Sequence, residues 1–433
     1  MKVLMFGWEF PPHISGGLGT ACKGLTDHLC EHGTEITFVM PKVEGAADGN
    51  ENFRIQPADQ VEISISRVHF KRYFDEQTVK FIEIDSILQP YLTEADYFEI
   101  ITEGTNTRLI ELIEKTDNYQ GKLPFSGKYG DTLMDEIGRY AVVGRQLGFS
   151  EDFDIIHAHD WMTYPAAVEA KRSSNKPLIC HIHATEYDRS GSRPNQAVYD
   201  MEKFGFENAD RIIAVSQRTK DTVISFYNIN PAKIFVVHNA VSKDKTRERS
   251  EVKKKLDEKI VLFLGRVTMQ KGPEYFIEAA AKVSKAIGNV RFVMAGSGDM
   301  LPRMIERTAA LRMQKNFHFT GFLRGTEVEE MFAMSDLYIM PSVSEPFGIT
   351  PFEAMLYHVP IIISKQSGIA EVLEHAIKVD FWDVDKLAES IIEILTNDEF
   401  AQELAEKDAK CLDGISWDTA AFKIEEHYKE LCK

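Results

Sequence analysis

Short apolar runs rich in Val and Ile recur along this chain, and stretches with helical periodicity separate them. Runs of this kind between helices are typical of parallel β-strands buried on both faces. They fall into two series, and the pattern predicts an α/β fold with two Rossmann-like parallel-sheet domains facing across a cleft. The first series is Val3–Phe6, Ile36–Met40, Ile155–His157, Leu178–Ile182, Ile212–Val215 and Ile234–Val237, and the second is Ile260–Leu264, Phe292–Ala295, Phe317–Thr320, Leu337–Met340 and Val359–Ile363.

The segment between the two series, residues 242–257, is polar, rich in charges of both signs and nearly free of core residues, which indicates a linker. It separates an N-terminal domain, residues 1–241, from a C-terminal domain, residues 258–413. Within the first domain, residues 45–150 break the alternation, so we interpret them as an insertion that mixes a β-hairpin with helices. Residues 414–433 have the pattern of a further helix.

The overall charge limits what this chain can bind. Its 433 residues include 50 Lys and Arg against 67 Asp and Glu, a formal net charge of −17. This charge disfavours nucleic acid and anionic membranes as partners, so any phosphate must be bound by a few local cations or backbone amides. No apolar run is long enough to cross a bilayer, and a cytoplasmic location is expected. The five cysteines are odd in number and form no Cys-x-x-Cys pair, so neither a disulfide framework nor a zinc site is expected.

A pair of carboxylates follows the fourth run of the second series. Glu345 and Glu353 flank a glycine loop that leads into a predicted helix, with Pro351 in its first turn. Glu353 can accept two hydrogen bonds from a vicinal diol such as ribose, and Glu345 lies where a sugar on a diphosphate would lie. The alternative is that Glu353 merely caps its helix. The positive end of this helix presents amides that can bind an anion, those of Gly348, Ile349 and Thr350.

Two cations follow the first run of the second series. Arg266 and Lys271 share one loop after the predicted strand, and neighbouring glycines allow a ligand to approach the backbone closely. Two cations on one loop can converge on a diphosphate and neutralise it as a leaving group. The alternative is that both are solvated surface cations. A further glycine turn, Ala295–Asp299, fits either a simple turn or a loop that contacts a nucleotide.

The first half contains a glycine loop of its own after its first run. Gly16-Gly17-Leu-Gly19 precedes a predicted helix, Thr20–Leu29, and its amides can also bind phosphate. The spacing is not Gly-x-Gly-x-x-Gly, so dinucleotide binding is not indicated.

Histidines and acidic residues gather at the ends of two further runs of the first half. A polar group that hydrogen-bonds a sugar ring is the preferred interpretation, while His157 and His181 are expected to be packed core histidines. Zinc is the alternative, but the spacings match no metal-binding helix motif, and residues along a strand end alternate between its two faces. The sequence therefore predicts no metal site. The residues concerned are His157, His159, Asp160 and Trp161, then His181, His183 and Glu186.

Together these motifs resemble the retaining nucleotide-sugar glycosyltransferases with two Rossmann-like domains, the GT-B type. Within that type the sequence is most similar to the family-4-like glycogen and starch synthases, and the resemblance covers essentially the whole chain. The motifs that carry it are Gly16-Gly17-Leu-Gly19, His159-Asp160-Trp161, His183-Ala-Thr-Glu-Tyr, the Arg266 and Lys271 pair, and Glu345-x7-Glu353.

The resemblance implies an enzyme that transfers glucose from UDP-glucose or ADP-glucose to the non-reducing end of an α-1,4-glucan and keeps the anomeric configuration. It implies no cofactor and no metal, because the nucleotide sugar is a substrate and the cations and helix end neutralise its phosphates. The expected partners are this donor and an α-glucan or another saccharide acceptor, with no nucleic acid and no membrane. The donor base and the oligomeric state stay open. So do a capsular, lipid-linked or small-molecule acceptor, a nucleotide-sugar epimerase and a non-catalytic glucan-binding scaffold.

The resemblance also implies roles for single residues. Arg266 and Lys271 would bind the donor diphosphate and stabilise it as it leaves. Glu345 would contact the donor sugar, and His183 would lie beside the sugar that is transferred. The residues implied to bind the rest of the donor are Gly16, Gly17, Gly348, Ile349, Thr350 and Glu353, the last at the ribose. Those implied on the acceptor side are Asp160, Trp161 and Glu186, and the terminal helix, Trp417–Lys433, would pack back on the first domain.

Overall fold

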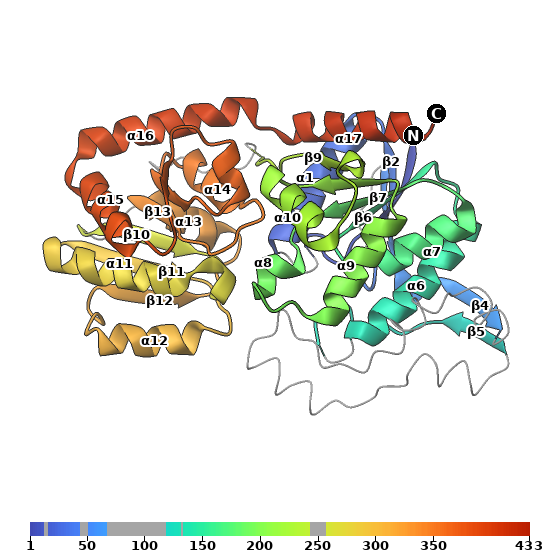
Figure 1. Ribbon diagram of the computed structural model, residues 1–433, viewed down its shortest axis with the longest axis horizontal. Coiled ribbons are helices and arrows are strands. Elements are labelled where there is room, and N and C mark those ends of the chain that lie inside the picture. Colours follow the sequence, from blue (N-terminus) through green and yellow to red (C-terminus); the bar gives the residue numbers. More distant parts are fainter. Residues whose placement is uncertain (13–15, 44–50, 67–117, 131–132, 243–256) are drawn as a thin grey trace. The chain divides into compact units, whose positions relative to one another are not determined.

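The computed structural model describes residues 1–12, 16–43, 51–66, 118–130, 133–242 and 257–433. The described chain divides into two compact units (Figure 1). Unit 1 comprises Met1–His238 and Trp417–Lys433, and unit 2 comprises Asn239–Ser416. The predicted linker, apart from its two end residues, and residues 67–117 of the predicted insertion lie outside the described residues.

Unit 1 is built on a seven-stranded sheet with the strand order β3-β2-β1-β6-β7-β8-β9, in which neighbouring strands are parallel. Its central strands are apolar and buried, as the Val- and Ile-rich runs predict. The edge strand β3 pairs with β2, so the parallel sheet extends into the range predicted as an insertion. The strands are β1 (Lys2–Phe6), β2 (Glu35–Met40), β3 (Phe53–Pro57), β6 (Ile155–His159), β7 (Leu178–Ile182), β8 (Arg211–Ala214) and β9 (Ile234–Val236).

The helices of unit 1 pack closely where glycines face a neighbour. A Cβ on Gly144 of α6 would lie 2.1 Å from the Ala166 carbonyl oxygen of α7, and one on Gly24 of α1 would lie 2.4 Å from the Trp417 ring of α17. The C-terminal helix α17 therefore packs on α1. A separate antiparallel pair is formed by β4 (Glu62–Ser66) and β5 (Asn118–Lys122). The helices are α1 (Gly17–Glu31), α6 (Leu133–Ser150), α7 (Tyr164–Ser174), α8 (Glu186–Ser190), α9 (Gln196–Asn208), α10 (Gln217–Tyr227) and α17 (Trp417–Leu431).

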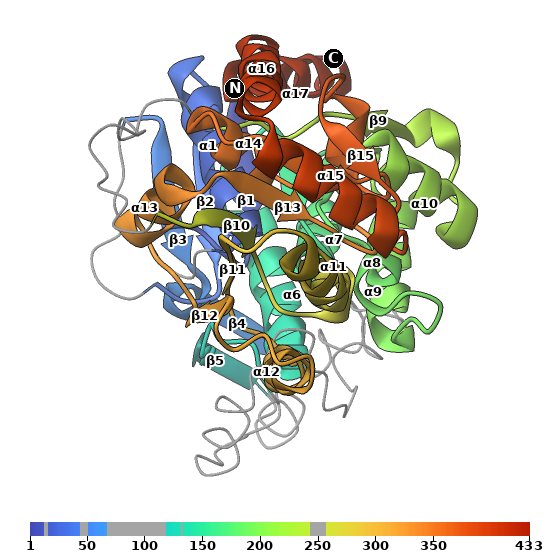
Figure 2. The same ribbon diagram turned by 90° about the vertical axis from the view of Figure 1, so that its left-hand side faces the viewer.

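Unit 2 contains a six-stranded parallel sheet with the order β12-β11-β10-β13-β14-β15. Helices α11 and α15 lie side by side over the sheet (Figure 2). The strands are β10 (Lys259–Leu264), β11 (Val290–Ala295), β12 (Phe317–Gly321), β13 (Leu337–Met340), β14 (Ile361–Ser364) and β15 (Ile377–Val379). The helices are α11 (Pro273–Ala286), α12 (Leu301–Ala310), α13 (Thr326–Met334), α14 (Thr350–Leu356), α15 (Val384–Thr396) and α16 (Asp398–Cys411).

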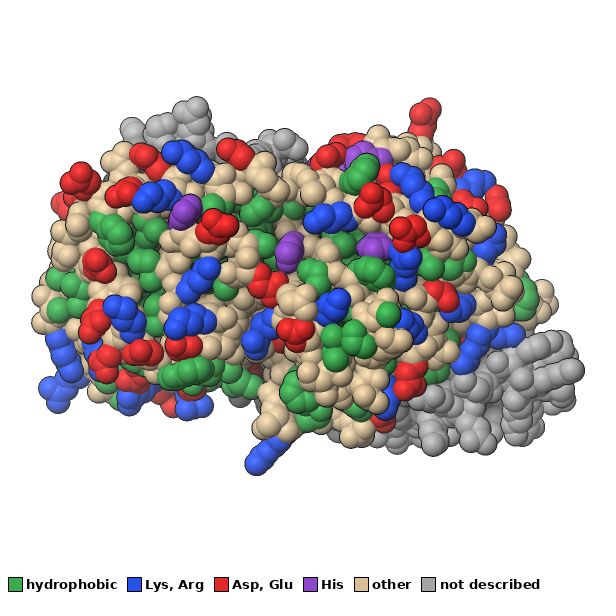
Figure 3. All heavy atoms as spheres, turned by 45° about the horizontal axis from the view of Figure 1, so that its top comes forward, with side chains coloured by type: hydrophobic (Ala, Val, Ile, Leu, Met, Phe, Trp, Pro, Cys, Tyr) green, Lys and Arg blue, Asp and Glu red, His purple; other side chains and the backbone are tan. Residues whose placement is uncertain are grey.

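Both sheets have the strand order of a Rossmann fold, in which the order reverses next to the first strand. The prediction of an α/β protein with two Rossmann-like parallel-sheet domains is therefore confirmed. Among the described residues, no helix combines the length and the apolar character that a bilayer span requires. On the face shown in Figure 3, acidic and basic side chains are interspersed, and the described residues there form no continuous basic patch.

Candidate active site

Each sheet has one position where the strand order reverses, between β1 and β6 in unit 1 and between β10 and β13 in unit 2. Open α/β sheets bind ligands at the carboxyl ends of the strands next to such a position. The predicted site residues follow these four strands and β7, the neighbour of β6. The topology thus places the motifs where this fold binds ligands.

In unit 2 the loops after β10 and β13 contact each other through their backbones. The Gln270 carbonyl accepts a hydrogen bond from the Val343 amide at 2.9 Å. Gly272 has φ +66°, and a Cβ there would lie 2.2 Å from the Pro341 carbonyl oxygen, so only glycine permits this approach. The local sequence therefore brings two candidate loops together at the reversal of strand order.

This contact joins two of the predicted catalytic residues. The Lys271 ammonium nitrogen lies 2.5 Å from Glu345 Oε2, and the Ser342 hydroxyl donates to the same oxygen at 3.2 Å. The Glu345 side chain is buried and the Lys271 side chain is 22% exposed. Arg266, by contrast, is exposed, and its Nη2 donates to Gln270 Oε1 at 3.4 Å. Lys271 and Glu345 therefore form one preassembled pair, with Arg266 on the same loop.

The helix α14 begins where the sequence predicts it, with Pro351 in its first turn and Ile349 at its N-cap. Gly348 before it has φ +96°, a conformation that favours glycine. Glu353 lies in the first turn, and no described residue hydrogen-bonds its carboxylate, so the structure shows no capping bond from it. Burial raises the pKa of Glu353 to about 7.

In unit 1 the glycine loop before α1 is held by a carboxylate that the sequence interpretation missed. Glu9 Oε2 accepts hydrogen bonds from the amides of Gly16 at 3.2 Å and Gly19 at 3.3 Å, and Tyr129 donates to Glu9 Oε1. A carboxylate is the natural partner of the positive end of a helix. The Gly16 amide, predicted to bind donor phosphate, is thus occupied by Glu9, whereas Gly17 is exposed and its Cα faces open space.

Asp160 fixes the backbone of His183. Its Oδ1 accepts a hydrogen bond from the His183 amide at 2.7 Å, and Asp160 itself has the unusual φ of +61°. Burial raises the pKa of Asp160 to about 7, although the His183 amide and the charge of Arg189 act in the opposite direction. Asp160 therefore positions the predicted catalytic histidine rather than pointing into open space.

Trp161 and Glu186, predicted on the acceptor side, have buried side chains instead. Trp161 is fully buried in the core of unit 1. Glu186 pairs with Arg189 Nε at 3.0 Å and accepts from the Asn195 amide at 3.0 Å. Their internal partners and packing leave neither side chain a surface for an acceptor in this structure.

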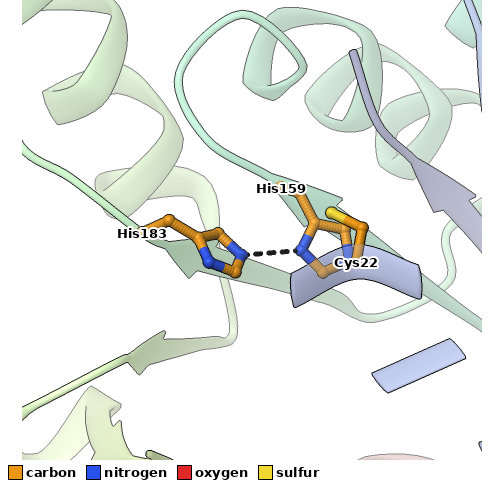
Figure 4. Close-up of side chains that lie close together, drawn as sticks. All are labelled: Cys22, His159 and His183. Carbon is orange, nitrogen blue, oxygen red and sulfur yellow. Dashed lines mark hydrogen bonds between the residues drawn. The ribbon is translucent and has the colours of Figure 1, made fainter. Parts of the chain in front are cut away.

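Four histidines at the ends of β6 and β7 lie on one side of the sheet: His157 and His159 in β6, His181 in β7, and His183 directly after β7. The expectation that the strand ends would disperse them was wrong, because residues two positions apart along a strand share a face. His157 and His181 are buried, as predicted for core histidines, and His157 Nδ1 lies 2.5 Å from the Tyr428 hydroxyl. His159 Nδ1 lies 3.0 Å from His183 Nε2 (Figure 4). Burial lowers the pKa of His157 and His183 to about 3, so both are neutral at pH 7.

Comparisons with known proteins agree with this arrangement. The family model Glycosyltransferase Family 4 matches residues 124–245, and the model Glycosyl transferases group 1 matches residues 244–410. An uncharacterized glycosyltransferase of Methanocaldococcus jannaschii is 28% identical, over 99% of this chain and 98% of its own length. Glycogen synthase of Mycobacterium tuberculosis is 23% identical, over 97% and 92%. Sucrose-phosphate synthase from Thermosynechococcus elongatus superposes with a TM-score of 0.73 at 16% identity, over 99% and 98%.

The chain therefore belongs to the GT-B glycosyltransferases, with a family 4-like domain followed by a group 1 domain. Its activity is the transfer of a sugar. Glycosyltransferases of this fold bind a nucleotide-sugar donor and a saccharide acceptor.

Proposed function

We propose that the chain is a retaining glucosyltransferase that moves glucose from UDP-glucose or ADP-glucose to the non-reducing end of an α-1,4-glucan. The observation that carries this proposal is the Lys271–Glu345 pair, held at the reversal of strand order in unit 2. The likeness of the whole chain to a glycogen synthase supports the choice of acceptor.

Lys271, Arg266 and the amides of Gly348, Ile349 and Thr350 bind the donor diphosphate in this proposal. Before the donor binds, Glu345 balances the charge of Lys271 at 2.5 Å. A diphosphate provides a second anion for the same ammonium group. Cleavage of the sugar–phosphate bond builds negative charge on the departing diphosphate, and a cation already in place stabilises that charge without reorganisation.

The acceptor attacks on the face from which the diphosphate departs. The bond from the anomeric carbon to the phosphate oxygen breaks, a bond to the acceptor oxygen forms, and the acceptor proton passes to the departing phosphate. Glu345 is less suited to act as a covalent nucleophile, because Lys271 and Ser342 already engage its Oε2. The proposed reaction needs no metal or other cofactor, since the cations and the helix end neutralise the phosphates.

Donor binding should depend on pH through Glu353. Its carboxylate is proposed to accept hydrogen bonds from the ribose diol, and the group has a pKa of about 7. If only the ionised form binds well, affinity for UDP or ADP rises by about tenfold between pH 6 and pH 8. Calorimetric titration across this range measures the change. Glu353→Gln should abolish the tenfold rise in affinity and keep only the pH dependence that comes from the nucleotide's own phosphate. If affinity depends on pH identically in both proteins, Glu353 does not bind the ribose in its ionised form.

The direct test of the proposed function is an incorporation assay. Radiolabelled UDP-glucose or ADP-glucose is incubated with the full-length protein, with and without glycogen, and nucleotide release and label in polymer are both measured. We expect release and incorporation to rise together when glycogen is present. Nucleotide release without label in polymer would overturn the glucan acceptor, and no release from either donor would overturn the donor class.

A second candidate is the same transfer to a capsular, lipid-linked or small-molecule sugar. The burial of Trp161 and Glu186 favours it, because both residues were expected on the acceptor side of a glucan synthase and neither side chain has a surface for an acceptor. In the same assay this candidate predicts that a small saccharide stimulates nucleotide release and receives the label, whereas glycogen does neither.

A further inference from the structure

The four histidines at the ends of β6 and β7 stack as a ladder of rings, of which His157, His159 and His181 are buried and His183 is partly exposed. Along β6 the ring centroids of His157 and His159 are 4.5 Å apart, and those of His181 and His183 are 4.3 Å apart. His159 also lies opposite His181 in the parallel register. The sheet thus concentrates four imidazole rings in one small volume.

Three ring nitrogens of this ladder have no partner among the described residues: His159 Nε2, His181 Nε2 and His183 Nδ1. A buried polar atom without a hydrogen bond costs about 1–3 kcal/mol of stability. Three such atoms in neighbouring rings are unusual for a packed core, and two of them, His159 Nε2 and His183 Nδ1, can hold the ring proton when the opposite nitrogen of the same ring binds a ligand.

Cys22 of α1 adds a sulfur to one end of the ladder. Its thiol is fully buried, and no described residue hydrogen-bonds to it. One ligand atom from each of Cys22, His159 and His183 lies within 4.8 Å of the others (Figure 4). The set His157, His159 and His181 is equally compact, but both nitrogens of His157 already have partners, Tyr428 and His181.

One sulfur and two imidazoles are a ligand set that zinc prefers. Tetrahedral zinc with ordinary Zn–S and Zn–N bonds places its ligand atoms about 3.3–3.6 Å apart. The facing nitrogens His159 Nδ1 and His183 Nε2 are 3.0 Å apart and share one hydrogen-bond proton, which must move to the opposite nitrogen of its ring before both can bind the ion. Small turns of these side chains would therefore close three ligands around one ion and leave a fourth position open.

We propose that Cys22, His159 and His183 form a binding site for a borderline-soft divalent metal ion, zinc in particular, and that zinc bound there inhibits sugar transfer. The inhibition rests on the proposed function and on the position beside the transferred sugar that the family resemblance implies for His183. A bound ion is coordinated by the His183 imidazole, which then cannot contact the sugar. The Cys22 thiol loses its proton to solvent on binding, because thiolate is the ligand.

Cobalt binding tests the site itself. Full-length protein is stripped with a chelator, desalted and titrated with Co²⁺, and Zn²⁺ is then added to displace it. We expect one equivalent with a thiolate-to-cobalt charge-transfer band and the strong visible bands of tetrahedral cobalt. Cys22→Ala should lose the charge-transfer band and at least about tenfold in affinity. Cys30→Ala, at a buried cysteine of the same helix, should keep both.

Absence of stoichiometric binding in the wild type, or a charge-transfer band that survives in Cys22→Ala, would overturn the site. His183→Gln removes a ligand from the partly exposed end of the ladder and provides the same test if Cys22→Ala does not fold.

Turnover with zinc tests the inhibition. We expect saturating zinc to lower the turnover of the wild type and of Cys30→Ala by at least about tenfold, with recovery after chelation, and Cys22→Ala to be insensitive to the same zinc concentration. Chelator alone should not lower turnover. Equal turnover of the metal-free and zinc-loaded wild type would overturn the inhibition. If metal-free protein transfers no sugar from any donor, the proposed function fails, while the cobalt titration still decides the site.

Discussion

Replacing Lys271 with alanine should lower the turnover number for glucosyl transfer by about 10²–10³-fold, the typical loss when one preorganised group that stabilises transition-state charge is removed. The ammonium group lies 2.5 Å from Glu345, on a loop that a backbone hydrogen bond joins to the loop after β13. The bound diphosphate is already anionic, and it gains a further negative charge as the sugar–phosphate bond breaks. We therefore expect the loss mainly in kcat rather than in KM.

Two further variants separate catalysis from stability. Lys282→Ala removes an exposed lysine of α11 that pairs with Asp385, and it should leave turnover near normal. Lys271→Ala leaves the buried Glu345 carboxylate without its cation. The thermal unfolding of this variant must therefore be compared with that of the double variant Lys271→Ala, Glu345→Gln. If Lys271→Ala retains near-normal kcat while folded, Lys271 has no part in the mechanism.

The strands and their loops were predictable because parallel strands buried on both faces must be apolar runs. Once the two series of runs were recognised, the motif residues had to follow strand ends. The edge strand β3 escaped notice because Phe53 and Ile55 are only partly buried and polar residues alternate with them. Its pairing with β2 depends on backbone hydrogen bonds that do not depend on side-chain pattern.

The sequence did not predict in the same way which polar side chains are free to bind a ligand and which pair with other residues of the protein. Glu186 and Glu353 look alike in sequence, since both lie in the first turn of a helix. Arg189 forms an ion pair with the Glu186 carboxylate, whereas no described residue hydrogen-bonds the Glu353 carboxylate. Likewise, Glu9 reaches the amides of the glycine loop from ten residues before Gly19. Such pairings depend on side-chain direction in the folded chain, and spacing along the sequence does not determine them.

Arg189 should be among the most sensitive positions of unit 1. Its guanidinium bonds Glu186 at 3.0 Å, Glu202 at 2.5 Å and the Ala184 carbonyl at 2.9 Å. All three charged side chains are buried. Arg189→Leu leaves two buried carboxylates without their cation, which costs about 3–5 kcal/mol. For a unit of this size we expect the unfolding temperature to fall by about 10 °C.

The matched control is Arg54→Leu, also in unit 1, where an exposed arginine pairs with Glu151. Exposed pairs contribute about 0–1 kcal/mol, so its unfolding temperature should change little. The double variant Arg189→Leu, Glu202→Gln should unfold at a higher temperature than Arg189→Leu alone, since it removes one of the two buried carboxylates that lack a cation. An unchanged unfolding temperature in Arg189→Leu would show that the network does not stabilise the fold.

The loss in Arg189→Leu should also depend on pH, with a definite sign. Burial raises the pKa of Glu202 to about 7, and the charge of Arg189 is the first of the opposing influences, so the pKa rises further without it. A carboxyl whose pKa is raised in the folded state destabilises that state as pH increases above its unfolded value. The difference in unfolding temperature between Arg189→Leu and wild type should therefore be larger at pH 8 than at pH 5.5.

Because Arg189 also bonds the Ala184 carbonyl, next to His183, turnover should fall in the same variant even at temperatures where it stays folded.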